Sequence, residues 1–347
     1  MLRVFGSKPG RWIATALACT GAAFGFAACG DSSDSGDTAG TVAVQAGQKE
    51  LPGGASLAGK KVLFLIHSTP DDTFFTPAIN GAKAAAALTG LEVQVEYGNN
   101  DDATTRRIVN TAIANGIDAL DLGIQDAGLN EVLCQAKEKR IPLVSYNVNG
   151  ATGAGADCVP AFVGQDFVAS GETVAQRLID SGLVKSGDTA LCPVEFPALS
   201  YAVERYQGVM NVLREHGIKC DELGTGVQPG DAKAKEVNYL IGHPDTAAIL
   251  GLGNFALTAA AEAVKQVKRD IPIVGFDLSE PVLNGIKDGT IIASIDQQPY
   301  SQGYLSIMQL ALQMKYGLTP ASINTSNGAL VDRSNVNAVT SLVPDYR

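Results

Sequence analysis

The segment KVLFLIHSTPDDTFF, residues 61–75, sets a pattern that the rest of the chain repeats. Its first six residues are mostly apolar, as is typical of a strand that is covered on both faces of a sheet. Polar and aromatic residues follow directly, and a helical pattern begins near Thr76. In open α/β sheets, ligands bind beyond the carboxyl ends of the strands. The residues after each predicted strand are therefore the first candidates for a binding site.

Apolar runs and helical patterns alternate along the rest of the chain. Further strands are predicted at residues 91–97, 119–124, 141–146, 189–194, 247–252, 271–276 and 291–295. Helices are predicted to begin near Ala103 and Leu129 and to occupy 166–181, 201–216, 231–242, 255–268, 279–287 and 301–315. Buried strands separated by helices indicate parallel sheets that are covered on both faces. Right-handed crossovers then predict an α/β fold of doubly wound lobes.

The length and the net charge of the chain limit the number of domains and the classes of function that are possible. The 347 residues are enough for two domains, and a hydrophobic content of 46% predicts a folded body. Lys and Arg total 26 against 36 Asp and Glu, so the formal net charge is −10. Binding to nucleic acid requires a basic surface that neutralises phosphates. We therefore expect no nucleic-acid partner.

The first 29 residues have the layout of a signal peptide. Three positive charges fall within residues 1–11, and residues 12–28 are uncharged and mostly apolar. The small residues before Cys29 resemble a bacterial lipobox, which predicts a lipoprotein signal peptide over 1–29 and a lipid on Cys29. The alternative is a single membrane anchor, for which the apolar run is short. Residues 30–58, rich in Gly, Ala and Ser, are expected to form a flexible tether.

Four cysteines remain in the body of the chain. An even number in an exported protein indicates disulfides, and four cysteines allow three pairings. Proximity in the sequence favours Cys134–Cys158 and Cys192–Cys220; the alternative is four reduced, buried thiols. Because no C-x-x-C motif or His pair is present, we expect no metal site.

Polar and aromatic residues follow most of the predicted strands. The candidate ligand-binding residues are Asp72, Phe74, Phe75, Asn147, Glu195, Arg205, Asn254, Asp277 and Gln297. Carboxylates and amides can orient hydroxyl groups, which donate and accept hydrogen bonds, and an aromatic ring can cover the C–H face of a sugar. The set predicts a neutral, hydroxyl-rich ligand.

Each candidate also has a structural interpretation. Phe74 and Phe75 could be core residues, and Asp72 could cap the helix that begins near Thr76. Asn254 and Asp277 could be turn or cap residues. Arg205 could be a solvated helix charge. The convergence of all of them at strand ends favours a common site.

Seven motifs surround these candidates in a fixed order along residues 60–335. They are DTFF ending at Phe75, IPLVSYN ending at Asn147, VGQD ending at Asp166, ERYQG from Glu204, HPDTAAILGLGN ending at Asn254, IVGFD ending at Asp277 and IDQQPYSQG ending at Gly303. This arrangement resembles the type I periplasmic sugar-binding proteins, which are the solute receptors of ABC importers for ribose-like monosaccharides. The resemblance implies ligand binding by all of the candidates except Glu195. The prediction for Glu195 is based only on its position after a predicted strand.

The resemblance also implies two lobes joined by three crossovers, with the ligand between them. We expect residues 59–164 and 298–328 to form the first lobe, and 165–297 and 329–347 the second. The implied partners are a monosaccharide or polyol and the transmembrane subunits of an ABC permease. The leader and Cys29 add the expectation of a lipid anchor in the membrane. We expect a monomer, exported and lipid-anchored on the outer face of the cytoplasmic membrane or in the periplasm.

Several positions depart from the ribose-binding pattern. Asn147 and Val148 stand where ribose receptors have an Asp-Arg pair, Gly123 stands where they have Asn, and Gly230 where they have Phe. The chain resembles a simple-sugar branch that takes pentoses, deoxyhexoses or polyols. Space at Val148 and Gly230 would suit a larger or less polar ligand than ribose.

Two other functions deserve comparison. A signalling receptor for a sugar-like ligand, such as an autoinducer or chemotaxis receptor, would share this fold and cleft. A glycan-modifying or dinucleotide-dependent enzyme has weaker support. The motif GLGNFA (251–256) is far from the first βαβ unit, and the three His residues are scattered, with His67 expected in the wall of the cleft. We predict no catalytic residues and no cofactor.

Overall fold

The computed structural model describes residues 51, 53–326 and 329–347, all within the compact unit Ala46–Arg347. The predicted signal peptide, the Cys29 lipidation site and most of the 30–58 tether lie outside the described residues. Within the described part of the chain, no helix combines the length and the apolar character that crossing a membrane requires.

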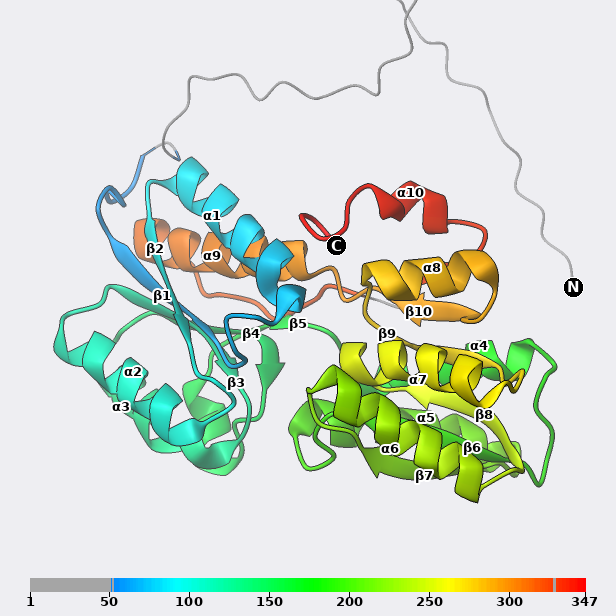
Figure 1. The fold of residues 1–347 in the computed structure, drawn as a ribbon. Coiled ribbons are helices and arrows are strands. Elements are labelled where there is room, and N and C mark those ends of the chain that lie inside the picture. Colours follow the sequence, from blue (N-terminus) through cyan, green and yellow to red (C-terminus); the bar gives the residue numbers. More distant parts are fainter. Residues whose placement is uncertain (1–50, 52, 327–328) are drawn as a thin grey trace, which may run out of the picture. The chain divides into compact units, whose positions relative to one another are not determined.

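Two six-stranded sheets organise the described residues (Figure 1). The first has the order β11-β5-β4-β3-β1-β2, formed by Ile323–Asn324, Phe162–Gly164, Leu143–Asn149, Ala119–Ile124, Lys61–Ile66 and Glu92–Tyr97, and all of its pairs are parallel. The second has the order β12-β10-β9-β8-β6-β7, formed by Leu330–Asp332, Ala293–Ile295, Ile273–Phe276, Thr246–Gly251, Thr189–Val194 and Lys219–Gly224. Only its β10–β12 pair is antiparallel.

Helices connect the strands of both sheets. They are α1 (Thr76–Thr89), α2 (Asp102–Ala114), α3 (Asn130–Glu138), α4 (Phe167–Asp180), α5 (Ser200–Glu215), α6 (Pro229–Gly242), α7 (Asn254–Val267), α8 (Glu280–Asp288), α9 (Pro299–Tyr316) and α10 (Val336–Thr340). Short 3-10 helices occupy η1 (Thr73–Phe75), η2 (Ala127–Leu129) and η3 (Gly153–Cys158). This architecture confirms the predicted fold class of two α/β lobes.

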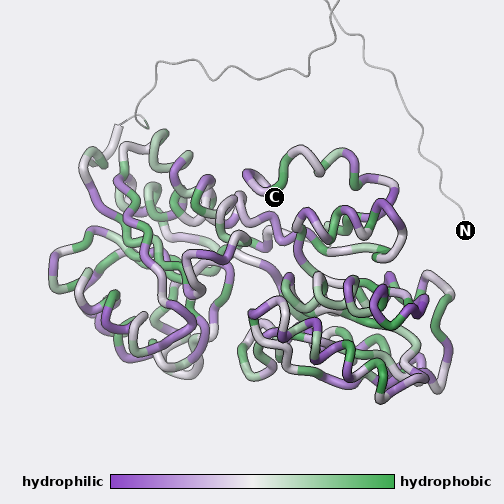
Figure 2. Tube along the Cα trace, viewed as in Figure 1, coloured by the Kyte–Doolittle hydropathy of each residue, from purple (hydrophilic) through white to green (hydrophobic). Residues whose placement is uncertain are grey.

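The chain passes between the two sheets after β5, after β10 and again after β11. Helix α9 packs against α1 of the first sheet, whereas α4 packs against α5 of the second. Figure 2 shows hydrophobic and hydrophilic residues alternating along the helices, as expected where one side of a helix lies on a sheet. Separate apolar clusters fill each face of each sheet, so each lobe has its own core.

Glycine allows α4 and α5 to approach closely. A β-carbon at Gly171 would lie 2.3 Å from the Arg205 carbonyl oxygen, and one at Gly208 would lie 2.0 Å from that of Val168. Side chains at either position would push the two helices apart. This close contact fixes the turn of α5 that carries Arg205.

The structure corrects several boundaries and adds elements. The strand predicted to end at residue 146 continues to Asn149, so Asn147 lies inside β4, where it adopts a left-handed φ of 61°. Strand β7, with the sequence KCDELG, was not predicted because it is a largely exposed edge strand without an apolar run. Strands β5, β11 and β12 are only two or three residues long, too short for a periodic signal.

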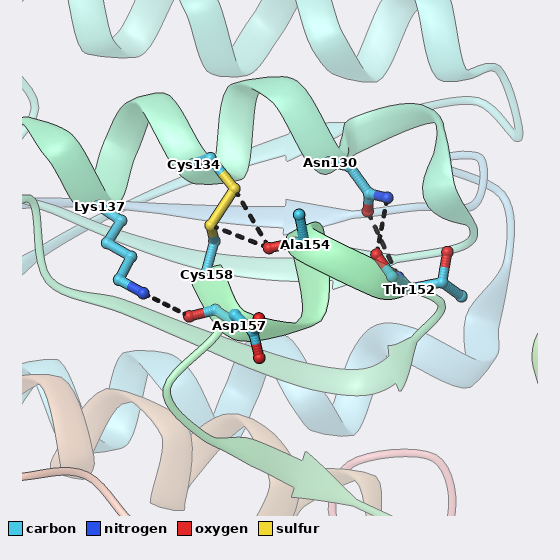
Figure 3. Close-up of a disulfide and its surroundings, with 7 residues drawn as sticks. All are labelled: Asn130, Cys134, Lys137, Thr152, Ala154, Asp157 and Cys158. Atoms are coloured by element: carbon cyan, nitrogen blue, oxygen red, sulfur yellow. Dashed lines mark hydrogen bonds between the residues drawn. A yellow bond between two sulfur atoms is a disulfide. The ribbon is translucent and has the colours of Figure 1, made fainter.

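Both cysteine pairs favoured by proximity are bonded in the structure. Cys134 on α3 joins Cys158 at the end of η3, and the two sulfur atoms lie 3.4 and 3.3 Å from the Ala154 carbonyl oxygen (Figure 3). The Lys137 Nζ donates to the Asp157 carbonyl at 2.7 Å on the same side. The second disulfide, Cys192–Cys220, links the paired strands β6 and β7. Each disulfide therefore lies within a single lobe.

Candidate ligand-binding site

A cavity lies at the carboxyl ends of strands from both sheets and contains about 580 Å³ of space, including its opening to solvent. All nine candidate residues line it: Asp72, Phe74, Phe75, Asn147, Glu195, Arg205, Asn254, Asp277 and Gln297. Residues far apart in the sequence are thus brought together where the alternating fold places a binding site.

Asp72 begins the wall that the first lobe contributes. Its carboxylate accepts from the Ser68 hydroxyl at 2.7 Å and from the Phe74 backbone N–H at 3.1 Å, which makes it the N-cap of η1. Burial raises the pKa of Asp72, and these two hydrogen bonds oppose the increase. The structural interpretation as a cap and the interpretation as a cavity residue are therefore both correct for this side chain.

Three rings form the aromatic part of the same wall. Phe75 is 2% exposed, packs edge-on against Phe74 and His67, and belongs to the core of the first lobe. Phe74 is half-buried. Burial lowers the pKa of His67 to about 4, so its imidazole is neutral at pH 7, and its Nδ1 has no hydrogen-bond partner among the described residues. A neutral imidazole can donate one hydrogen bond and accept another, which suits a hydroxyl group.

Arg205 is the cation of the second lobe's wall, and it is 2% exposed. Its Nη1 donates to the Leu252 carbonyl at 2.6 Å, and its Nε and Nη2 donate to the Gln165 Oε1 at 3.2 and 2.9 Å. The guanidinium lies over the Phe276 ring, 4.2 Å from the centroid. Of five N–H donors, these bonds use three, so two N–H groups can serve a ligand. The interpretation of Arg205 as a solvated helix charge is wrong.

A chain of hydrogen bonds joins Asp277 to the crossover segments. The Gln297 amide donates to the Asp277 Oδ1, the Gln302 amide donates to the Gln297 carbonyl at 3.0 Å, and the Asn147 amide donates to the Gln302 Oε1 at 3.0 Å. Burial raises the pKa of Asp277 to about 6, although Arg205 and the Gln297 amide both oppose the increase. Asp277 has a left-handed φ of 74°. Such strained backbone in a non-glycine residue often marks a functional site.

Glu195 lines the cavity, but both of its oxygens already have partners. Oε1 accepts the backbone N–H groups of Phe255 and Ala256 at 2.9 and 3.2 Å, at the start of α7, and Oε2 accepts the Tyr201 hydroxyl at 3.1 Å. A carboxylate at a helix N-terminus is stabilised by the helix dipole. Glu195 therefore holds the beginning of α7, where Asn254 presents a buried Oδ1 without a partner among the described residues.

The charges of this cavity disfavour an anionic ligand. Asp72, Glu195 and Asp277 are acidic, and Arg205 is the one basic side chain among the lining residues. An anionic ligand would meet more negative than positive charge. The acceptors at Asp72 and Asp277, the donors of Arg205 and the rings of Phe74 and Phe75 match the hydroxyl and C–H groups of a sugar or polyol.

The sequence had not indicated every wall of the cavity. Phe167, Tyr201, Gln125 and Asn100 also line it, whereas Gly230 is not among the lining residues. Gly230 lies on α6, and a β-carbon there would meet no atom within 4 Å. The extra space expected at this position is therefore not part of the cavity. Among the missed residues, Tyr201 could have been found from the sequence, because it lies one helical turn before Arg205 on α5.

Comparisons with known proteins agree with this architecture. A family described as a periplasmic binding protein domain matches residues 62–318. A xylose/arabinose-binding protein of Sulfolobus acidocaldarius is 26% identical over 80% of this chain and 72% of its own length. A ribose import binding protein of Bacillus subtilis is 27% identical over 72% of this chain and 82% of its own length.

Solved structures show the same fold. A periplasmic sugar-binding protein of Legionella pneumophila, 25% identical, covers 77% of this chain and 99% of its own with a TM-score of 0.70. A carbohydrate transporter of Acidothermus cellulolyticus in complex with myo-inositol is 24% identical. It covers 82% of this chain and 98% of its own, with a TM-score of 0.72. The chain belongs to the periplasmic binding protein family. It is accordingly a solute-binding protein rather than an enzyme, and it acts outside the cytoplasm.

The two phenylalanines should separate binding from folding. We expect Phe74→Ala to weaken sugar binding by about 1–3 kcal/mol through loss of a ring contact. Phe75→Ala should instead lower the free energy of unfolding by about 3–5 kcal/mol, because it leaves a cavity in the core. Urea denaturation and titration calorimetry on both variants measure the two effects. Equal losses of stability in the two variants would contradict this division of roles.

Proposed function

We propose that this protein captures a neutral monosaccharide or polyol in the cavity between its two lobes and delivers it to an ABC import permease. The observation that carries the proposal is the convergence of Asp72, Arg205 and Asp277 with aromatic rings around one cavity. The names of the relatives support it, since they bind xylose, arabinose or ribose. A xylitol-binding protein of Mycolicibacterium smegmatis, 26% identical over 64% of this chain and 63% of its own length, supports polyols as candidates.

Each class of lining residue has a role in this proposal. Asp277 and Asp72 accept hydrogen bonds from ligand hydroxyls, Arg205 donates to a ring or hydroxyl oxygen, and Asn147, Asn254 and Gln297 complete the polar wall. Charge-assisted hydrogen bonds of this kind contribute about 1.5–3 kcal/mol each, so a few of them account for micromolar affinity. Glu195 acts mainly through Tyr201 and α7, which it holds in position.

Closure of the two lobes on the ligand completes the proposed cycle. The chain crosses between the sheets at three places, and the Ser200 hydroxyl of α5 donates to the Gln125 carbonyl of the first lobe at 3.4 Å. A ligand that contacts both walls favours the closed state because it gains contacts there that the open state lacks. The closed form would then be the form that the permease recognises.

A thermal-shift screen of the purified full-length protein tests this function. The panel contains D-xylose, L-arabinose, D-ribose, D-fucose, myo-inositol and xylitol at millimolar concentration. A micromolar ligand at about a thousand times its Kd adds about 4 kcal/mol to stability, which is easily visible in the melting temperature. Sugar phosphates serve as a charged control and should produce no shift. A panel without any shift would contradict the proposal.

We further propose that Cys29 carries the lipid that holds the protein at the outer face of the cytoplasmic membrane. The small residues before Cys29 and the basic start of the chain support this. The Cys29→Ala variant should leave the membrane fraction and appear in the periplasm or the medium, as detected by immunoblotting. Cys19→Ala, which changes a cysteine within the apolar run, is the matched control and should remain with the membranes. Retention of Cys29→Ala would favour an uncleaved anchor.

A further inference from the structure

A second, larger cavity adjoins the candidate ligand site and has no role in the function proposed above. It contains about 1310 Å³ of space, including its opening to solvent. Its walls come from η1, the loop before α8, α8 itself, the start of α9 and residues 340–347. The last residues of the chain thus form one side of it.

The two cavities share part of their walls. Phe74, Asn254, Asp277 and Gln297 line both of them. Two of these four carry buried amide oxygens, the Asn254 Oδ1 and the Gln297 Oε1, without a hydrogen-bond partner among the described residues. Gln297 is only 5% exposed. Because a buried acceptor without a partner is unfavourable, both oxygens are suited to accept hydrogen bonds from a ligand at the boundary of the two cavities.

The segment that closes the second cavity is held in place by specific contacts. Arg347 forms an ion pair with Asp296, whose side chain is 2% exposed, next to Gln297. The Asn80 amide of α1 donates to the Asp345 carbonyl at 3.1 Å. The rings of Tyr300 and Tyr346 lie 5.2 Å apart. These contacts tie residues 345–347 to the first lobe and to the crossover, so the cavity has a fixed wall.

The chemistry of the second cavity matches a neutral group with both polar and apolar faces. Leu283, Val343 and Pro344 contribute apolar surface, and Ser279, Asn284 and Thr340 contribute polar groups. The carboxylate of Asp296 is already paired with Arg347. The remaining charged groups of the wall, Asp277, Glu280 and Lys287, are of both signs. The walls therefore present hydrogen-bonding and van der Waals contacts, and no single sign of charge among them selects an ion.

We propose that the second cavity receives a substituent carried by the sugar, either the aglycone of a neutral glycoside or the second ring of a disaccharide. This inference rests on the proposed function, since it places the sugar ring in the first cavity. The substituent would pass the boundary formed by Phe74, Asn254, Asp277 and Gln297 and would lie against α8 and residues 340–347. The protein then accepts glycosides as well as free sugars.

Titration calorimetry on the full-length protein tests the inference. Each sugar that shifts the melting temperature is compared with its methyl and phenyl glycosides of both anomers and with a disaccharide that contains it; an inositol or polyol is compared with its galactosylated form. In the variant Asn284→Trp, an exposed residue of α8 places an indole in the second cavity. Asn337→Trp is the matched control, because Asn337 is an exposed residue of the neighbouring helix α10 that does not line the cavity.

We expect at least one substituted form to bind within about tenfold of its free sugar. Asn284→Trp should weaken that form at least tenfold and change the affinity of the free sugar less than twofold, and Asn337→Trp should change neither. Rejection of every substituted form by more than a hundredfold, with free sugars bound, would overturn the inference and leave the proposed function intact. Equal weakening of free and substituted sugars by Asn284→Trp would also overturn it. Absence of binding by any sugar would overturn both.

Discussion

Asp277→Ala should reduce sugar affinity by at least about 100-fold, because it removes a buried acceptor able to bind two ligand hydroxyls. Titration calorimetry at pH 7.5 measures the loss. Asp277→Asn is the more informative partner, since its side-chain oxygen can still accept from the Gln297 amide, whereas alanine leaves that donor unpaired. We expect both variants to lose affinity and the asparagine variant to retain the fold. Unchanged affinity in both would remove Asp277 from the site.

The raised pKa of Asp277 makes the stability of the folded protein depend on pH. Burial raises its pKa to about 6, so between about pH 4 and 6 the folded protein binds a proton that the unfolded chain releases. The contribution of this carboxyl to stability therefore decreases as pH rises through that interval and is lost above pH 6. Asp277→Asn should consequently melt at a higher temperature than the wild type at pH 7.5. A lower melting temperature would contradict the assigned cost of the buried carboxylate.

Ligand affinity should depend on pH in the opposite direction. Lowering the pH from 7.5 to 5 protonates Asp277 and removes an acceptor, so wild-type affinity should fall. The pKa of Asp72 is also raised by burial, and Asp72 lines the same cavity. Any change of ligand affinity with pH that remains in Asp277→Asn is therefore assigned to Asp72. Equal slopes in the wild type and the variant would show that Asp277 does not titrate with binding.

Arg205→Met should produce the second large effect, a loss of about 100-fold in sugar affinity. Methionine keeps much of the apolar contact with Phe276 but removes every donor, so ligand oxygens lose a charge-assisted partner. The Gln165 Oε1 and the Leu252 carbonyl also lose their partners, which should lower the free energy of unfolding by about 1–3 kcal/mol. Calorimetry and urea denaturation distinguish the two losses.

Arg214→Met provides the matched control for Arg205→Met. Arg214 lies on the same helix, α5, but it is exposed and does not line the cavity. The substitution is chemically identical, so we expect neither sugar affinity nor stability to change by more than about 0.5 kcal/mol. Comparable losses of affinity in the two variants would indicate a general effect of charge on binding, and the specific role of Arg205 would have to be abandoned.

The sequence predicted the regular part of the fold because buried parallel strands are continuous apolar runs. Residues 61–66, 119–124 and 189–194 coincide with β1, β3 and β6. Edge strand β7 was not predicted because Lys219, Asp221 and Glu222 are exposed and the strand has no apolar run. Strand β4 continues past its apolar run and includes Asn147. The pattern of apolar residues along the sequence indicates which strands are buried. Whether a segment pairs as an edge strand depends instead on residues that are distant in the sequence.

The sequence also located the candidate residues of the cavity, because strand ends in this fold meet at one place. It could not distinguish how each side chain is used. The Glu195 carboxylate is occupied by the start of α7, and the Phe75 ring lies mostly in the core; both facts depend on packing between distant elements. The second cavity was invisible for the same reason, since residues 340–347 have no periodic pattern that places them beside α8.

The placement of the two disulfides has a consequence for how the molecule matures. Cys134–Cys158 and Cys192–Cys220 each close a short loop, of 24 and 28 residues, and neither crosses from one sheet to the other. Each disulfide can therefore reinforce one lobe independently of the other, and neither of these two bonds would restrict the lobe closure that we propose. This placement is compatible with the proposed cycle, in which the two lobes close on a ligand and open again without breaking either disulfide.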